Sequence, residues 1–256
     1  MKSDTFNKVN LILGWVCFLI TFFVYFSTAE PTVSFWDTGE YITTSSKLQV
    51  GHPPGAPLYQ MLGAIFSFFA FGNENIGFIM NLMSGFSSAL TIAFMYWSIV
   101  LIILKITTDT ENLSINRQLA ISGAGLVGAL SFSFTDSFWF NAVEAEVYAM
   151  ATLIMSILFY LGLKWEKDMH HDRGNKWLLL ICFVIGLSFG VHFMGLLTIP
   201  AIVLIYYFKN QKSIQNRFKI NKVYGFLLAN IFGLLILMGT FKLILPNTLK
   251  FFSAIE

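Results

Sequence analysis

The chain has 256 residues, of which 56% are hydrophobic and only 12% are charged, and its formal net charge is +2. So little charge excludes a soluble domain of this length, which needs more charged residues to cover its surface. No basic cluster is interleaved with aromatic residues, so nucleic acid is not an expected partner. The apolar residues form uninterrupted stretches, and we therefore predict an all-α, polytopic transmembrane helical bundle.

Charge-free stretches predict about seven transmembrane helices, because one crossing of a bilayer core about 30 Å thick takes about 20 apolar residues. They cover residues 9–28, 79–104, 119–135, 147–163, 177–191, 193–208 and 223–241. The fifth and sixth are short and only His192 separates them, which predicts a tight hairpin of two helices. The whole chain, 1–256, is interpreted as one transmembrane domain. Because it ends soon after the last stretch, we expect it to be the N-terminal part of a longer protein.

A further apolar stretch, residues 57–71, is short for a crossing and is predicted to be an interfacial helix in an outer loop over 29–78. With a cytoplasmic N-terminus, most of the 16 basic residues then lie inside, and only Lys47, Lys242 and Lys250 lie outside.

In a competing arrangement, 57–71 crosses the membrane and the N-terminus is outside, with a charge distribution nearly as good. Both arrangements place 136–146 outside, but they differ on whether 34–54 shares that side. The short stretch, together with Lys2 and Lys8, favours the first.

The first candidate site is the pair Asp37 and Glu40, which follows the first predicted span. On a short helix, residues three apart are neighbours, so the pair could serve as a general base with an orienting or metal-binding partner. The alternative is a capping box, with Asp37 at the N-cap and Glu40 at N3. Spacing leaves both open, and the two are compatible.

Two histidines are further candidates. His52 opens the rigid turn His52-Pro53-Pro54-Gly55 and could face a phosphate or a hydroxyl, or the turn could simply lead into the interfacial helix. His192 lies at the tip of the predicted hairpin, where a lone histidine is more often a hydrogen-bonded structural residue than a ligand.

Glu144 and Glu146 precede the fourth predicted span, and Tyr148 follows them. On a helix, residues two apart point about 200° apart, so at most one of the two carboxylates would face a given site. The alternative is an acidic, solvated loop. The flanking aromatic residues instead favour a loop packed at the membrane interface.

The order of these motifs resembles that of the GT-C membrane glycosyltransferases. More narrowly, the stretches are similar to bacterial relatives of the TMEM-type protein O-mannosyltransferases, glycosyltransferase family 117. The similar stretches are FWDTGEY at 35–41, GHPPGAPLY at 51–59, EAEVY at 144–148 and GLSFGVH at 186–192. The sequence departs from the family at Ala56, where an aromatic residue is expected.

The resemblance implies a GT-C-like fold and transfer of a sugar, such as mannose, from a polyprenyl-phosphate donor to a protein or other hydroxyl acceptor. The expected reaction takes place on the outer face of the membrane and inverts the anomeric carbon. Asp37 would be the base, and Glu40 would orient the base or the acceptor. The remaining implied binding residues are Glu144, Glu146, His52, His192, Lys47, Lys242 and Tyr148.

The expected partners are membrane lipid, the lipid-linked sugar and the acceptor. The richness in Phe, Ile, Lys and Asn suggests an AT-rich bacterial genome, and hence an inner membrane with the site facing the periplasm. No arginine is expected on the outer face, although arginine is the usual bidentate phosphate ligand. The positive charge could come from a divalent metal ion or from the rest of the protein, and no cofactor is assigned.

Two other functions compete with the enzyme. A transporter or lipid flippase places ionisable residues within its spans, whereas here the predicted spans carry none and the acids gather at one surface. In a noncatalytic membrane scaffold, Asp37 and Glu40 would only cap a helix. No P-loop, GxGxxG, HExxH, CxxC or nucleophile-elbow motif is present, which argues against ATPases, dehydrogenases, zinc proteases and typical hydrolases.

Overall fold

The computed structural model describes residues 3–53, 55–107 and 113–255. Lys2 and Pro54, used above for the topology and the turn, lie outside these ranges. Within them every regular element is a helix, which confirms the all-α fold class.

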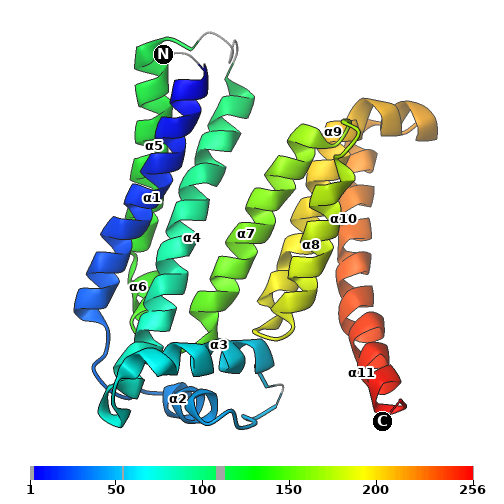
Figure 1. The fold of residues 1–256 in the computed structure, drawn as a ribbon. Helices are drawn as coiled ribbons and strands as arrows, with labels where there is room; N and C mark the ends of the chain where they lie inside the picture. Colours follow the sequence, from blue (N-terminus) through cyan, green and yellow to red (C-terminus); the bar gives the residue numbers. More distant parts are fainter. Residues whose placement is uncertain (1–2, 54, 108–112, 256) are drawn as a thin grey trace.

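Long helices stand side by side, and the short helices α2 and α3 lie across one end of them (Figure 1). The long helices are α1 (Ser3–Thr28), α4 (Ile76–Ile106), α5 (Ile115–Ser133), α7 (Val147–Asp168), α8 (Asn175–Ser188), α9 (Ile199–Phe218) and α10 (Lys222–Gly239). The shorter helices are α2 (Thr38–Ser46), α3 (Pro57–Ser67), α6 (Asp136–Ala142) and α11 (Leu245–Ser253). Three short 3-10 helices are η1 (Phe68–Ala70), η2 (Asn73–Asn75) and η3 (Phe193–Thr198), and η4 (Thr240–Ile244) is a π-helical segment.

Each predicted span coincides with one of the long helices, but these differ in length. Among the described residues, five helices are long and apolar enough to cross a membrane, or six if α5 and α6, bent by 70° at their junction, form one span. The remaining one, α8, has 14 residues, and a helix of that length covers only about 21 Å. The number of crossings therefore stays a prediction.

Large apolar side chains remain exposed along the long helices, among them Phe23 of α1, Leu179 of α8 and Leu235 of α10. Soluble monomers rarely expose apolar surface on this scale. Lipid tails cover such surface, and the helices satisfy their own backbone hydrogen bonds, as a bilayer requires. The chain is an integral, multi-pass membrane protein.

Helix α4 is the central element, since it packs against α1 and α5 on one side and against α7 on the other. Gly14 of α1 allows the closest of these contacts. A Cβ atom there would collide with the Trp97 ring of α4, and the Trp97 indole donates to the Asn10 carbonyl at 3.2 Å. The α1–α4 pair therefore depends on a small residue at position 14.

Helix α3 lies crosswise at the end of the bundle where the α1–α2 loop, α6 and the tip between α8 and η3 also lie (Figure 1). We call this the α2–α3 end. Two backbone N–H groups of α3, those of Leu58 and Tyr59, donate to the Gly190 carbonyl at 2.7 and 3.1 Å. The segment 57–71 therefore lies across the end of the bundle, as expected for an interfacial helix, and which side of the membrane it faces stays a prediction.

The hairpin predicted at His192 is a tight turn, because the His192 N–H donates to the Ser188 carbonyl at 2.8 Å. The helix η3 begins one residue later. At the opposite end of the bundle, Glu166 of α7 pairs with Lys105 of α4 at 3.2 Å and with Lys209 of α9 at 3.4 Å. These ion pairs join α4, α7 and α9 at the end of the bundle opposite the α2–α3 end.

Candidate active site

Asp37 is the N-cap residue of α2, but its side chain makes no capping hydrogen bond. Glu40, in the first turn, is bonded elsewhere. The capping-box interpretation is therefore wrong for this helix, and both carboxylates are left for other partners. The preceding residue, Trp36, has φ of 59° and is exposed. A bulky residue in the left-handed region is uncommon and is often found at functional sites.

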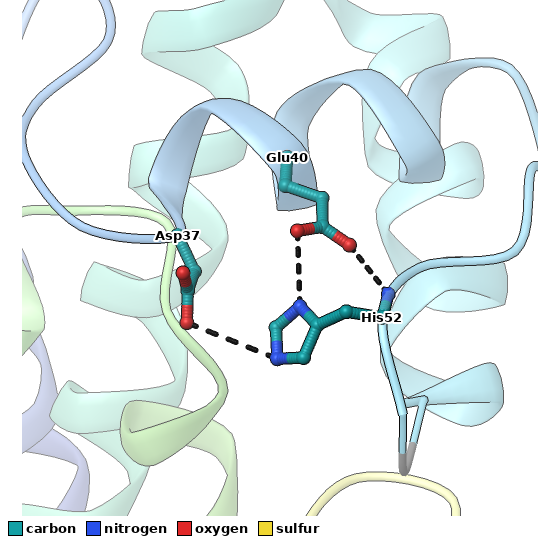
Figure 2. A group of neighbouring side chains, drawn as sticks. All are labelled: Asp37, Glu40 and His52. Atoms are coloured by element: carbon teal, nitrogen blue, oxygen red, sulfur yellow. Dashed lines mark hydrogen bonds and ion pairs between the residues drawn. The ribbon is translucent and has the colours of Figure 1, made fainter.

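Glu40 holds His52 with both of its oxygen atoms (Figure 2). Its Oε1 accepts from the His52 backbone N–H at 2.6 Å, and its Oε2 lies 2.9 Å from His52 Nδ1. An ionised carboxylate only accepts, so Nδ1 carries the hydrogen. The backbone bond and then the ring bond lower the pKa of Glu40, and the bond to Glu40 raises the pKa of His52. The turn after α2 thus brings residues twelve apart together.

The other ring nitrogen of His52, Nε2, points toward Asp37, with 4.0 Å between it and Oδ2 (Figure 2). One ligand atom from each of Asp37, Glu40 and His52 lies within 4.8 Å of the other two. Carboxylate oxygen suits Mg²⁺ and Mn²⁺, and imidazole nitrogen suits Zn²⁺, so the residue types and their spacing fit a divalent ion.

Glu144 and Glu146 are buried, with only 3% and 5% of their surfaces exposed. The segment between α6 and α7 is not helical, and Glu146 is the extended N-cap of α7. The prediction that the two glutamates lie on a helix, with at most one of them facing a given site, is therefore wrong. Both carboxylates face the segment from Ser34 to Thr38.

The two buried carboxylates have different partners. Glu144 Oε2 accepts from the Ser34 hydroxyl at 2.5 Å, and burial raises the pKa of Glu144. Burial, followed by the charges of Asp37 and Glu144, raises the pKa of Glu146 to about 7, although the Asp37 backbone N–H donates to it. Four carboxylates from two distant segments thus gather at the α2–α3 end.

One residue that holds these segments together was missed from the sequence. Asn81 of α4 is fully buried. Its Nδ2 donates to the carbonyls of Glu30 and Thr32 at 2.7 and 2.8 Å, and its Oδ1 accepts from the Ala145 N–H at 2.8 Å. An amide inside an apolar span was the available signal, because such residues are costly there and usually functional.

Tyr41 was also missed. Its ring lies between His52 and Tyr59, with centroids 6.3 and 5.2 Å away. Burial, and then the charges of Glu146 and Asp37, raise the pKa of Tyr41 to about 12. Tyr41 of α2 therefore packs on the His52 ring and also experiences the charges of the exposed Asp37 and the buried Glu146.

Tyr148 and His192 form a pair beside this cluster, with ring centroids 5.4 Å apart. His192 Nδ1 accepts from the Met194 N–H at 3.2 Å, as an N-cap of η3, and burial lowers its pKa. The structural interpretation of His192 thus has direct support. Lys47 and Lys242 are exposed, and within the described ranges neither forms an ion pair with the four carboxylates.

A cavity of about 1,490 Å³ lies between α8, α9 and α10 and is mostly apolar. None of the site residues predicted from the sequence lines it. A smaller cavity, about 470 Å³, includes Tyr148 in its wall. The candidate site residues therefore gather at the α2–α3 end and not in the larger, apolar cavity.

Comparison with known proteins identifies the family. The family described as the Protein O-mannosyl-transferase TMEM260 N-terminal domain matches residues 37–215, which begin at Asp37. Protein O-mannosyl-transferase tmem260 of Dictyostelium discoideum is 24% identical over 255 residues, which are 95% of this chain and 28% of that protein. Protein O-mannosyl-transferase TMEM260 of Mus musculus is 26% identical over 153 residues, 59% of this chain and 19% of that protein.

The chain thus spans less than a third of the length of the curated relatives it matches, and no solved structure matches it. The bacterial origin stays a prediction. Because the family match covers more than half of the chain and includes the whole acidic cluster, this chain belongs to the TMEM260 N-terminal domain family of protein O-mannosyl-transferases.

Proposed function

We propose that the chain carries the catalytic acidic centre of a membrane glycosyltransferase, which moves a mannosyl group from a polyprenyl-phosphate donor to a protein hydroxyl on the outer face. The observation that carries the proposal is the gathering of Asp37, Glu40, Glu144 and Glu146 at one end of a membrane bundle. The names of the relatives support mannose and a protein acceptor.

In the proposed reaction Asp37 is the general base. Its side chain is 57% exposed and does not cap α2, so an acceptor hydroxyl can approach it. Asp37 takes the hydroxyl proton while the hydroxyl oxygen forms a bond to the anomeric carbon. The bond from that carbon to the phosphate oxygen breaks, and the lipid phosphate leaves with the electron pair. A single displacement inverts the anomeric carbon.

Glu40 and His52 position the reacting groups. The two bonds of Glu40 to His52 fix the imidazole so that Nε2 faces Asp37. A carboxylate that accepts from one ring nitrogen commonly orients the other nitrogen toward a metal ion. We propose that Asp37, Glu40 and His52 hold a divalent ion, which would supply the positive charge that a leaving phosphate needs.

Metal removal is expected to lower transfer at least about tenfold, because the loss of a second-shell or ligand interaction typically costs 10- to 100-fold. Treatment with EDTA followed by Mg²⁺ or Mn²⁺ checks this, and the added ion should restore the rate. Binding of Mn²⁺, followed by electron paramagnetic resonance, should weaken in His52→Ala and stay unchanged in Glu74→Gln, an exposed residue of η2. Full activity after chelation would contradict the metal proposal and leave the transferase proposal standing.

The donor class is tested with the purified protein in lipid nanodiscs. Radiolabelled mannose is expected to pass from polyprenyl-phosphate mannose to a serine- and threonine-rich peptide, and not from a nucleotide sugar, since no nucleotide-binding motif is present. Transfer from the nucleotide sugar alone would refute a lipid donor. Movement of the lipid across the bilayer without transfer would favour the flippase.

A further inference from the structure

The smaller cavity lies between α4, α5, α6, α7 and η3, and its wall includes Tyr148, which packs on His192. Ser88, Asn141, Tyr148, Thr152 and Met194 are among the residues that line it. Its volume, about 470 Å³, falls within the range of about 300–1,000 Å³ that is usual for small-molecule sites. The cavity is thus large enough for one small polar group.

Ser88 is the residue of this cavity that most directly indicates a missing hydrogen-bond partner. It is 1% exposed, and within the described residues its Oγ has no hydrogen-bond partner. Its neighbours on α4 differ, because Ser87 donates to the Met83 carbonyl at 2.9 Å and Thr91 to the Ser87 carbonyl at 3.0 Å. A buried hydroxyl without a partner is costly and calls for an explanation. A ligand hydroxyl in the cavity would provide the missing partner.

Three other polar side chains of the wall already donate to backbone carbonyls and keep acceptor oxygens. Thr152 donates its hydroxyl hydrogen to the Tyr148 carbonyl at 2.6 Å, and Thr135 donates to the Phe132 carbonyl at 2.8 Å. Asn141 Nδ2 donates to the Ser137 carbonyl at 2.8 Å, which leaves Oδ1 as an acceptor. A ligand with several O–H donors matches this wall.

The lining residues also determine which ligand groups the cavity disfavours. Its lining residues include no Asp, Glu, Lys, Arg or His, so the wall offers a phosphate or a carboxylate no counter-charge. Phe138 and Tyr148 provide aromatic faces, against which the apolar face of a sugar ring can pack. The lining therefore suits a neutral, polyhydroxylated ring.

The cavity begins next to the proposed reaction centre. Tyr148 is two residues after Glu146 and packs on His192. Ser84 Oγ accepts from the Glu146 N–H at 3.4 Å, and Ser88 lies four residues, about 6 Å, further along α4. The cavity wall is therefore connected to the segment of Glu146 through Tyr148 and through α4.

We propose that this cavity is the subsite for the neutral, hydroxyl-bearing sugar ring of the donor, with Ser88 as a hydrogen-bonding residue. The proposal rests on the proposed transferase function, and an acceptor serine or threonine side chain has the same chemistry. Sugar is favoured because the cavity offers several acceptors and two aromatic faces, more than one hydroxyl needs.

The test compares Ser88→Ala and Thr152→Val with Ser87→Ala, whose hydroxyl is already bonded within α4. Retention of polyprenyl-phosphate mannose on the purified protein is measured by filter binding against polyprenyl phosphate without sugar. We expect the wild type and Ser87→Ala to prefer the sugar-bearing lipid. Ser88→Ala should lose about threefold to tenfold of that preference, the value of one neutral hydrogen bond.

Two further readouts separate the alternatives. Without ligand, Ser88→Ala is expected to unfold at the same or a higher temperature, since it removes an unpartnered buried hydroxyl. A lower unfolding temperature with unchanged lipid preference would overturn the subsite and make Ser88 structural. A raised KM for the peptide with unchanged donor preference would assign the cavity to the acceptor. Lipid preference that persists without any transfer would refute the transferase while keeping the subsite.

Discussion

Asp37→Asn is expected to reduce mannose transfer by about 10²- to 10⁴-fold, the usual contribution of a positioned general base. The amide has nearly the same shape as the carboxylate but cannot take the proton. Because Asp37 makes no capping bond to α2, the substitution should leave the folded state intact. Initial rates with the lipid-linked donor, together with the unfolding temperature in detergent, measure the two effects separately.

Asp136→Asn is the matched control, because Asp136 is an exposed acid in the first turn of α6 at the same end of the bundle. It should keep the wild-type rate. If Asp37→Asn retains full transfer, the base lies elsewhere, and Glu146 becomes the next residue to replace. If the Asp37→Asn variant does not fold, Asp37 is a structural residue that supports α2. The noncatalytic scaffold is then the favoured interpretation.

Asn81→Leu is expected to destabilise the protein by about 3 kcal/mol or more. The substitution leaves the carbonyls of Glu30 and Thr32 and the Ala145 N–H without their partner. Each buried group left unsatisfied costs about 1–3 kcal/mol. Transfer should also fall, because the segment with Glu144 and Glu146 would no longer be held against the first loop. Denaturant unfolding in detergent and the transfer rate measure both effects.

Asn230→Leu is the control for this substitution. Asn230 also lies in an apolar helix, but its amide donates only to the Phe226 carbonyl one turn earlier. Its replacement should change stability by less than about 0.5 kcal/mol, as is usual away from buried networks. Equal stability of the Asn81 variant and the wild type would mean that Asn81 does not hold the two loops.

The sequence determined the features that depend on local composition. The fold class and the helix at each predicted span follow from runs of apolar residues, since burial in lipid depends on the residues of one helix. The break at His192 was also predicted correctly, because α8 and η3 meet there in a tight turn. The motifs at Asp37 and His52 could be singled out because Asp37 and Glu40 are three residues apart and His52 opens a rigid turn.

Only the tertiary structure decided how these parts meet. Spacing could not distinguish a capping box from a free carboxylate pair, because Glu40 turns to His52 across a loop. Glu144 and Ser34 are 110 positions apart and are bonded, and the buried Asn81 joins both of their segments. Such contacts depend on which side chains face each other after the helices pack. Hydropathy is summed along single segments of about 20 residues and contains no information about pairs so far apart.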